Sequence, residues 1–302
     1  MKLVRVDGGM GRVICAVPAI EKLAKTDEVV VQIAGHGWIF DNNPNIKKCL
    51  SIEDPDVWDE YIKDGEFITP EPYHNHLYYK QKHHLIQSFD YLINGEEEMS
   101  KPKLYLSEVE EEFGKSMVET VKEQMGVDKI VVLQPFGASA NAQVKYHDET
   151  GRSLPYEFVK LFPKKMKDCG IFMMGFGDND PTFQKFDNCV ILNYDMRHWC
   201  AMIKHADYFI GCDSVGQHIA RAFDIPGTVF LGETYQENIA YPDHFKIIQE
   251  KGFPTSYIPM RIADWKKSGK LPFKFTEKEQ KELIRRIESH MDDQLEEIKK
   301  SA

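Results

Sequence analysis

The sequence lacks the features that mark several classes of protein. No apolar run approaches the ~18 residues that a membrane-spanning helix needs, and the opening MKLVRVDGG has no apolar segment after its basic residues. We therefore expect neither a membrane span nor a secretory signal. Internal repeats and low-complexity tracts are absent as well. With 302 residues, 42% of them hydrophobic, the chain is long enough for two globular domains.

Paired cysteines and excess positive charge are also missing. The six cysteines form no CxxC pair, which argues against a zinc ribbon or a disulfide framework and indicates a reducing cytoplasm. The formal net charge is −10, which disfavours a broadly basic surface for nucleic acid or membranes but leaves room for a local basic patch.

The pattern of apolar segments predicts an α/β protein. The first 35 residues show a strand over Lys2–Val6, a glycine-rich turn, a helix, and a second strand over Val29–Ala34. A second series predicts strands at Lys129–Gln134, Gly170–Gly175, Val190–Leu192, Tyr208–Gly211 and Thr228–Leu231, and helices at Pro155–Cys169, Met196–His205 and Ser214–Phe223. Residues 51–103 give no clear pattern. Alternating strands and helices favour parallel sheets, so we expect two Rossmann-like domains.

Two further helices decide the expected domain limits. Glu108–Met125 is an acidic amphipathic helix that ends at a glycine, and it closes a first domain of residues 1–125. A second domain spans 126–275. A charged helix over 276–302 is expected to return to the first domain; Thr276 is its predicted N-cap, with Glu279 three residues on.

Two strand-to-helix turns carry candidate chemistry. Gly9 and Gly11 lie in the first turn, Asp7–Arg12, where a helix N-terminus favours anions; taken alone, this turn indicates a structural role. The stronger signal is the turn after the strand that ends at Gly211, where Asp213 and Ser214 precede a helix. Backbone N–H groups of such a turn hold diphosphates. The alternative is a capped helix with Asp213 only as its N-cap.

The second turn belongs to a longer string that resembles the signature of the family 9, heptosyltransferase-like glycosyltransferases. The matching residues are Gly211, Asp213, Ser214, His218, Ala220, Ala222 and Pro226, followed by Val229–Thr234. Three other stretches are similar to the family in the same order: Val4–Ile20, Asn42–Ile46, and Gln134–Ser139 with Arg152–Pro155. The similarity is weakest between about residues 51 and 125.

This resemblance implies a GT-B fold, in which two Rossmann-like domains face each other across a cleft. The first domain takes the acceptor, and the second takes a nucleotide-diphosphate sugar, UDP- or ADP-linked, without a cofactor or a metal. Carried over by position, the donor contacts are Gly9, Gly11, Arg12, Ser139, Arg152, Asp213, Ser214, Val215, Gly216, His218 and Glu233. Transfer inverts the anomeric centre, with a base that deprotonates the acceptor hydroxyl.

The base is where the chain departs from the family. The family has Asp directly after the last glycine of the first loop, and this chain has Arg12, which cannot act as a base. We expect Asp7 to take that role, with His36 in reserve and Arg12 as an anion contact. The alternative is that Asp7 closes the turn and Arg12 is a surface cation.

Two patterns resemble metal sites. Asp178-Asn179-Asp180 is similar to the DxD motif of another glycosyltransferase architecture, but it follows a strand and is expected to border the nucleotide. The histidines at 74, 76, 83 and 84 have no cysteine or acidic ligands nearby in the sequence. We therefore expect no metal.

The stretch Tyr73–His84 contains no acidic residue. Basic groups interleaved with aromatic rings suit phosphate contacts and base stacking, so Tyr79, Lys80 and Lys82, together with Trp38, are assigned to acceptor binding. A partly buried helix edge with exposed lysines explains the stretch equally well.

Three functions remain open at this point. The first is transfer to 5-hydroxymethylcytosine in double-stranded DNA, since large DNA phages have similar proteins; the location would then be the host cytoplasm. The second is a heptosyltransferase-like enzyme acting on lipopolysaccharide or another anionic glycan. The third is an inactive nucleotide-sugar binding protein, suggested by Arg12.

Overall fold

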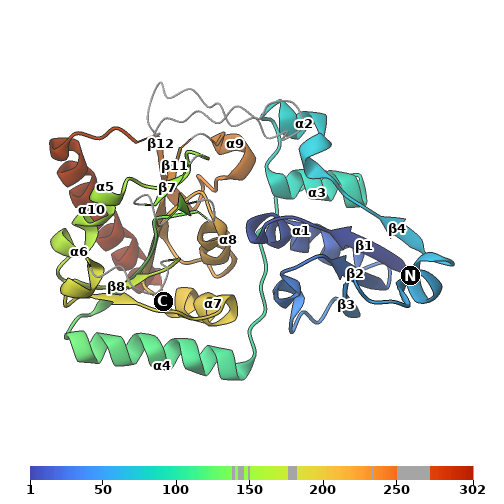
Figure 1. The fold of residues 1–302 in the computed structure, drawn as a ribbon, viewed down its shortest axis with the longest axis horizontal. Coiled ribbons are helices and arrows are strands. Elements are labelled where there is room, and N and C mark those ends of the chain that lie inside the picture. The colour runs from blue at the N-terminus through green and yellow to red at the C-terminus, as the bar shows by residue number, and fades with distance from the viewer. Residues whose placement is uncertain are drawn as a thin grey trace. The chain divides into compact units, whose positions relative to one another are not determined.

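The computed structural model describes residues 1–137, 140–141, 146–148, 150–175, 182–232, 234–249 and 273–301. Its contacts divide the chain into two compact α/β units (Figure 1). Among the described residues, unit 1 comprises Met1–Ser107 and Gln236–Ile239, and unit 2 comprises Glu108–Tyr235 together with 240–249 and 273–301. None of the helices described is both long enough and apolar enough to cross a lipid bilayer.

Unit 1 is built on a four-stranded sheet in the order β3-β2-β1-β4, with every pair parallel. The central strands β1 (Lys2–Val6) and β2 (Val29–Ile33) agree with the prediction to within one residue, because both are short runs of buried β-branched and apolar side chains. The edge strands β3 (Lys48–Ser51) and β4 (Glu66–Ile68) were not predicted, since they are short and largely exposed.

The helices of unit 1 are α1 (Met10–Leu23), α2 (His76–Tyr79), α3 (Leu85–Asn94) and α9 (Gln236–Ile239), with short helical turns η1 (Gly37–Phe40), η2 (Trp58–Ile62) and η3 (Pro72–His74). α3 packs against α1. In α9, the buried Asn238 donates hydrogen bonds from Nδ2 to the carbonyls of Tyr78, at 2.8 Å, and His83, at 2.9 Å. These bonds place α9 in unit 1.

Unit 2 contains a six-stranded parallel sheet in the order β12-β11-β10-β5-β8-β9. Its strands are β5 (Lys129–Gln134), β8 (Cys169–Met173), β9 (Cys189–Ile191), β10 (Tyr208–Cys212), β11 (Gly227–Leu231) and β12 (Phe245–Gln249). All except β12 were predicted, within two residues. Both Rossmann-like patterns of the sequence are thus α/β units with parallel sheets.

The helices of unit 2 are α4 (Glu108–Met125), α5 (Tyr156–Val159), α6 (Leu161–Lys165), α7 (Met196–His205), α8 (Val215–Ala222) and α10 (Glu277–Ser301), with the turn η5 (Phe183–Lys185) and a hairpin of β6 (Ala140–Asn141) and β7 (His147–Asp148). The single helix predicted over Pro155–Cys169 is instead α5 and α6, followed by a turn. Pro163, which lacks a backbone N–H, lies within α6.

The predicted boundary at residue 125 is wrong, because α4 packs along α7 in unit 2. Gly114 permits the close approach: a Cβ there would lie 2.5 Å from the carbonyl oxygen of Ala201. The Arg197 guanidinium also forms an ion pair with Glu110, with Nη2 and Oε2 2.5 Å apart. The helix therefore begins the second unit, and the boundary lies at 107/108.

The predicted return of the C-terminal helix to the first domain is also wrong. Ile284, Ile287 and Met291 of α10 are buried in the core of unit 2. The buried Tyr208 hydroxyl lies 2.7 Å from Nδ1 of His290. The predicted cap is confirmed at the other end of this helix. The backbone N–H of Thr276 donates to Glu279 Oε2 at 2.7 Å, and that of Glu279 donates to Thr276 Oγ1 at 3.3 Å.

Candidate functional site

The carboxyl edge of the unit 2 sheet, where its parallel strands end, contains most of the predicted donor contacts. In this sheet, β8 and β9 lie on one side of β5, and β10, β11 and β12 lie on the other side. The order of the strands thus reverses between β5 and β10, and ligands of open α/β sheets bind beside such a switch point. Gln134 ends β5, and Asp213 and Ser214 directly follow β10.

Asp213 is buried rather than open at a helix cap. Its Oδ1 accepts a hydrogen bond from Gln217 Nε2 at 2.9 Å, and its Oδ2 accepts one from Thr234 Oγ1 at 2.6 Å. Burial raises the pKa of the Asp213 carboxyl, while the positive charge of Arg152 and the bond from Thr234 act in the opposite direction. Asp213 therefore links α8, through Gln217, to the segment that follows β11, through Thr234. The N-cap is Ser214, without a side-chain capping bond.

Gln134 binds the start of α8, a contact that the sequence analysis missed. Its Nε2 donates to Ser214 Oγ at 3.2 Å, and its Oε1 accepts from the backbone N–H of Gly216 at 2.7 Å. A Cβ at Gly216 would lie 2.4 Å from that Oε1 and 2.8 Å from the Phe209 ring. The glycine at 216 is therefore required by internal packing. The sequence did contain a signal for this contact, because the polar Gln134 ends the otherwise apolar strand β5.

His218 and Val215 are also buried within unit 2. The Nδ1 of His218 lies 2.7 Å from the hydroxyl of Tyr241, and the histidine is 2% exposed. Val215 is 7% exposed. Both side chains are thus part of the interior of unit 2. A direct donor contact from either residue stays a prediction.

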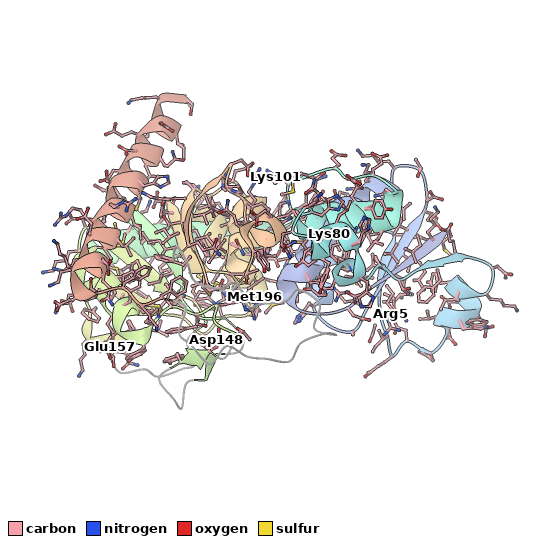
Figure 2. The ribbon with its side chains drawn as sticks, turned by 90° about the horizontal axis from the view of Figure 1, so that it is seen from above. Arg5, Lys80, Lys101, Asp148, Glu157 and Met196 are labelled. Carbon is pink, nitrogen blue, oxygen red and sulfur yellow. The ribbon has the colours of Figure 1, made fainter. Side chains whose placement is uncertain are left out.

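Arg152 lies in a turn organised by the buried Asp148, which is labelled in Figure 2. Asp148 accepts hydrogen bonds from the backbone N–H groups of Thr150, at 2.8 Å, and Ser153, at 3.1 Å. Burial acts against ionisation, but the hydrogen bonds from Ser153 and Thr150 hold the pKa of Asp148 below its usual value. Ser153 Oγ accepts a bond from the N–H of Gly137, just beyond β5, at 2.9 Å.

The same turn places the guanidinium of Arg152 at the edge of the unit 2 sheet. Its Nε donates to Thr150 Oγ1 at 3.1 Å, and its charge acts on the buried Asp213. Arg152 and Asp213 are 61 residues apart in the chain, and the charge of the one acts on the pKa of the other. Ser139 and Glu233, and the motif Asp178-Asn179-Asp180, lie outside the described residues.

In unit 1, the predicted glycine turn joins β1 to α1. Gly8 has a φ of +106°, a backbone conformation that residues other than glycine rarely adopt. Gly9 is the N-cap of α1. Gly11 is the second residue of that helix. Asp7 Oδ2 forms an ion pair with Arg5 Nε at 2.9 Å. The catalytic role of Asp7 stays a prediction.

Arg12 is neither a lone surface cation nor an open anion contact. Its Nη2 lies 3.0 Å from Glu71 Oε2, its guanidinium carbon lies 5.0 Å from the centre of the Tyr73 ring, and its side chain is only 12% exposed. The residue that neutralises it, Glu71, lies 59 positions further along the chain. The sequence analysis did not find this ion pair.

His36 and Trp38 lie in the loop that follows β2. His36 has a φ of +64° and precedes η1, whose second residue is Trp38. Both side chains are half-buried. Their assignments as reserve base and acceptor contact stay predictions.

The stretch Tyr73–His84 does not form a continuous basic and aromatic surface. Tyr78, His83 and His84 are buried: His84 caps α3 by accepting from the N–H of Ile86 at 3.1 Å, and His83 lies 3.2 Å from Glu97. Tyr79, Lys80 and Lys82 are exposed; Figure 2 labels Lys80. The structure therefore agrees with the alternative of a partly buried helix edge with exposed lysines.

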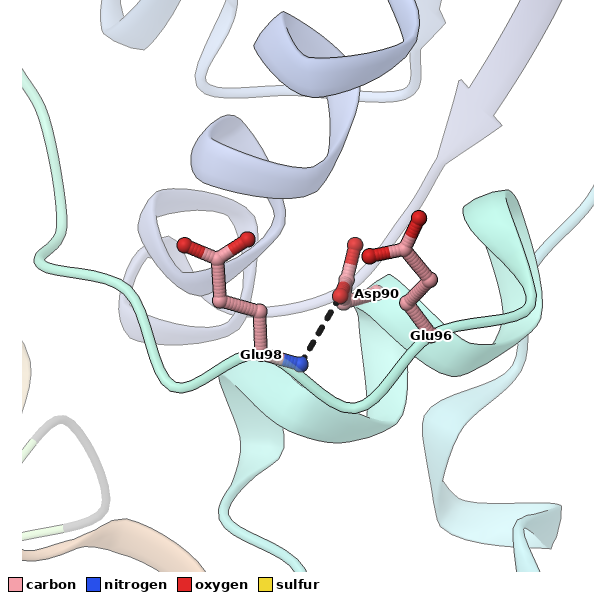
Figure 3. Close-up of side chains that lie close together, drawn as sticks. All are labelled: Asp90, Glu96 and Glu98. Carbon is pink, nitrogen blue, oxygen red and sulfur yellow. Dashed lines mark hydrogen bonds between the residues drawn. The ribbon is translucent and has the colours of Figure 1, made fainter.

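Three carboxylates of unit 1, those of Asp90, Glu96 and Glu98, lie within 4.8 Å of one another (Figure 3). The ammonium of Lys22 occupies the group, 3.0 Å from Asp90, 2.7 Å from Glu96 and 2.9 Å from Glu98. These acids hold a lysine of α1, and we assign no metal to them.

Comparison with protein-family models and with curated proteins finds no match. Solved structures do match. A family 9 glycosyltransferase from Veillonella parvula has a TM-score of 0.66 at 12% identity, over 96% of each chain. Escherichia coli ADP-heptose lipopolysaccharide heptosyltransferase II has a TM-score of 0.64 at 9% identity, over 97% of this chain and 99% of that one.

A third match is Escherichia coli heptosyltransferase WaaC with ADP, with a TM-score of 0.54 at 11% identity, over 85% of this chain and 95% of that one. Identities this low establish the fold and nothing finer. The chain therefore has the α/β fold of the family 9 glycosyltransferases and heptosyltransferases.

Proposed function

We propose that this protein is a glycosyltransferase that moves a sugar from a nucleotide-diphosphate sugar to an acceptor hydroxyl with inversion. The observation that carries the proposal is the agreement of the fold with family 9 glycosyltransferases over 96% of the chain. The polar edge of unit 2, at the switch point between β5 and β10, adds to it, because such edges bind ligands in α/β proteins.

The proposed donor site is that edge of unit 2. Arg152, held by its turn against Thr150, is the cation that would contact the diphosphate and stabilise its charge as it departs. Ser214, half-exposed at the start of α8, is the second residue that we assign to the proposed donor site. The names of the similar structures mention ADP and ADP-heptose, so we propose an ADP-linked donor, with UDP as the alternative.

The proposed acceptor site is the carboxyl edge of the unit 1 sheet, around the glycine turn after β1. A base in this region takes the proton of the attacking hydroxyl, and Asp7 and His36 are the residues that the sequence assigns to this step. Transfer then requires the GT-B arrangement, with the two edges facing each other, which is part of the proposal. We also keep the reducing cytoplasm as the proposed location.

We propose a glycan acceptor, and DNA becomes the alternative. The similar structures include a lipopolysaccharide heptosyltransferase, whereas the stretch that suggested DNA has Tyr78, His83 and His84 buried. Lys80 and Lys82 remain exposed. A DNA acceptor would be favoured if the protein binds duplex DNA and if replacing Lys80 and Lys82 by glutamine weakens both this binding and its dependence on salt. Each phosphate contact contributes about −0.9 to the slope of the logarithm of the binding constant against the logarithm of the salt concentration.

The test of the proposed function combines binding and turnover. Mass spectrometry after incubation with ADP- and UDP-sugars, with and without small glycans or hydroxymethylcytosine DNA, detects transfer or donor hydrolysis. Donor binding without either reaction would indicate the inactive binding protein instead.

For Arg152→Ala, calorimetry should show nucleotide-diphosphate binding weakened by ~1.5–3 kcal/mol, the size of a lost charge-assisted contact. Arg285→Ala, which removes an exposed cation of α10, should bind as the wild type does. Equal affinity of Arg152→Ala and the wild type would remove Arg152 from the site.

A further inference from the structure

The sheet of unit 1 has its own switch point, between β1 and β4. From β1 the chain continues to β2 and β3 on one side, whereas β4 lies on the other. The paired positions of these strands run from Lys2 with Glu66 to Val4 with Ile68. Asp7 and Glu71 each lie three residues beyond the last pair. Two carboxylates therefore follow the switch point, where α/β sheets bind their ligands.

The glycine turn is shaped around Arg12, which reaches Glu71. A Cβ at Gly8 would lie 2.9 Å from Cδ of Arg12, so the glycine leaves room for the arginine side chain. Arg12 then donates from Nη2 to Glu71 Oε2 at 3.0 Å, with its guanidinium against the Tyr73 ring. Because Arg12 is only 12% exposed, it is a fixed partner that sets the direction of the Glu71 carboxylate.

Glu71 is oriented and still reachable. Its second oxygen, Oε1, accepts a hydrogen bond from the backbone N–H of Tyr73 at 3.3 Å. Each carboxylate oxygen has two lone pairs, so each of these oxygens keeps one for a substrate hydroxyl. The Glu71 side chain is 39% exposed.

Asp7 is less well arranged for the same task. Its side chain is 41% exposed, and its Oδ2 accepts from Arg5 Nε at 2.9 Å. Its Oδ1 is buried and has no hydrogen-bond partner among the residues that the structure describes. A general base must come within about 2.6–3.2 Å of the proton donor that it serves, so Asp7 can serve only through Oδ2, with the one lone pair that Arg5 leaves.

We propose that Glu71 is the catalytic base of the transfer and that Arg12 is its positioning residue. The inference rests on the proposed function. The acceptor O–H bond breaks and its proton moves to a Glu71 oxygen, while the freed electron pair forms the bond to the anomeric carbon. The bond from that carbon to the diphosphate oxygen breaks, and its electron pair leaves with the nucleoside diphosphate.

The test compares carboxylate variants of the full chain under saturating donor. Glu71→Gln keeps an oxygen that accepts from Arg12 but cannot take the proton, so kcat should fall roughly 10²–10⁴-fold. Binding of ADP, followed by calorimetry, should not change. Asp7→Asn should lower kcat much less than Glu71→Gln. Glu66→Gln, which removes a 61% exposed carboxylate of β4 paired with Lys2, is the matched control and should leave kcat at the wild-type value.

Two further variants separate catalysis from folding. Glu71→Asp keeps the charge on a shorter side chain, so it should fold and retain more activity than Glu71→Gln. Arg12→Met should lower kcat while KM for the donor is kept, because the carboxylate loses its positioning cation. A folded Glu71→Gln variant with kcat within about threefold of the wild type overturns the inference and leaves the proposed function standing. A wild type that neither transfers the sugar nor hydrolyses the donor overturns both the inference and the proposed function.

Discussion

Gly216 gives the sharpest contrast between a ligand-binding and a packing explanation of the turn after β10. The sequence assigned this glycine to the donor site, where it would let the backbone approach a diphosphate. In the structure, an alanine Cβ at this position would lie 2.4 Å from Gln134 Oε1 and 2.8 Å from the Phe209 ring. Gly216→Ala should therefore act mainly on the stability of unit 2.

The size of the effect follows from three contributions. Overpacking a close-packed interior costs about 1–3 kcal/mol, and displacing Gln134 removes a hydrogen bond to the backbone worth about 0.5–1.5 kcal/mol. Replacing glycine by alanine in a helix returns at most about 1 kcal/mol. The free energy of unfolding should thus fall by ~0.5–4.5 kcal/mol, which at roughly 2–4 °C per kcal/mol for a unit of this size lowers Tm by several degrees.

Differential scanning calorimetry measures this change, with Gly137→Ala as the control. Gly137 lies at the same edge of the sheet, and its Cβ would meet Asp148 Oδ2 and Ser153 Oγ only at ordinary contact distances of 3.6 and 3.8 Å. Its Tm should stay close to that of the wild type. If Gly216→Ala unfolds as the wild type does but binds nucleotide diphosphate more weakly, the packing explanation is wrong and the ligand-approach explanation holds.

Two other predictions concern charged groups. Burial and the charge of Lys246 lower the pKa of His290 in the folded state, so the unfolded chain binds the proton more readily; stability is complete above about pH 6.5 and falls as the pH drops below it. His290→Gln should weaken this dependence in thermal melts at pH 7.5 and 5.5, and an unchanged pH dependence would contradict the assignment. Lys22→Met leaves Asp90, Glu96 and Glu98 without their shared cation. It should destabilise the chain by about 1–3 kcal/mol, less than a fully buried pair because Glu96 and Glu98 are exposed. Ca²⁺ should recover part of this loss in denaturation curves, and a variant as stable as the wild type would refute the role of Lys22.

The sequence by itself determined the elements whose signals are local. The bounds of β1, α4, β5 and α7 agree with prediction residue for residue, because apolar periodicity and terminal residues specify such segments. The cap formed by Thr276 and Glu279 was found for the same reason, since its two partners are three residues apart. The α/β class followed from the alternation of these elements.

The tertiary structure decided whatever depends on partners distant in the chain. Arg12 was expected to contact an anion or to be a surface cation, and the fold pairs it with Glu71, 59 residues away. The stretch Tyr73–His84 was compatible with a basic binding surface or a partly buried helix edge, and the fold buries His83 and His84. α4 and α10 were assigned to the wrong unit because an amphipathic helix specifies which of its faces is buried and not which core covers it. Burial and pairing arise from contacts across the fold, and an isolated sequence carries no direct record of them.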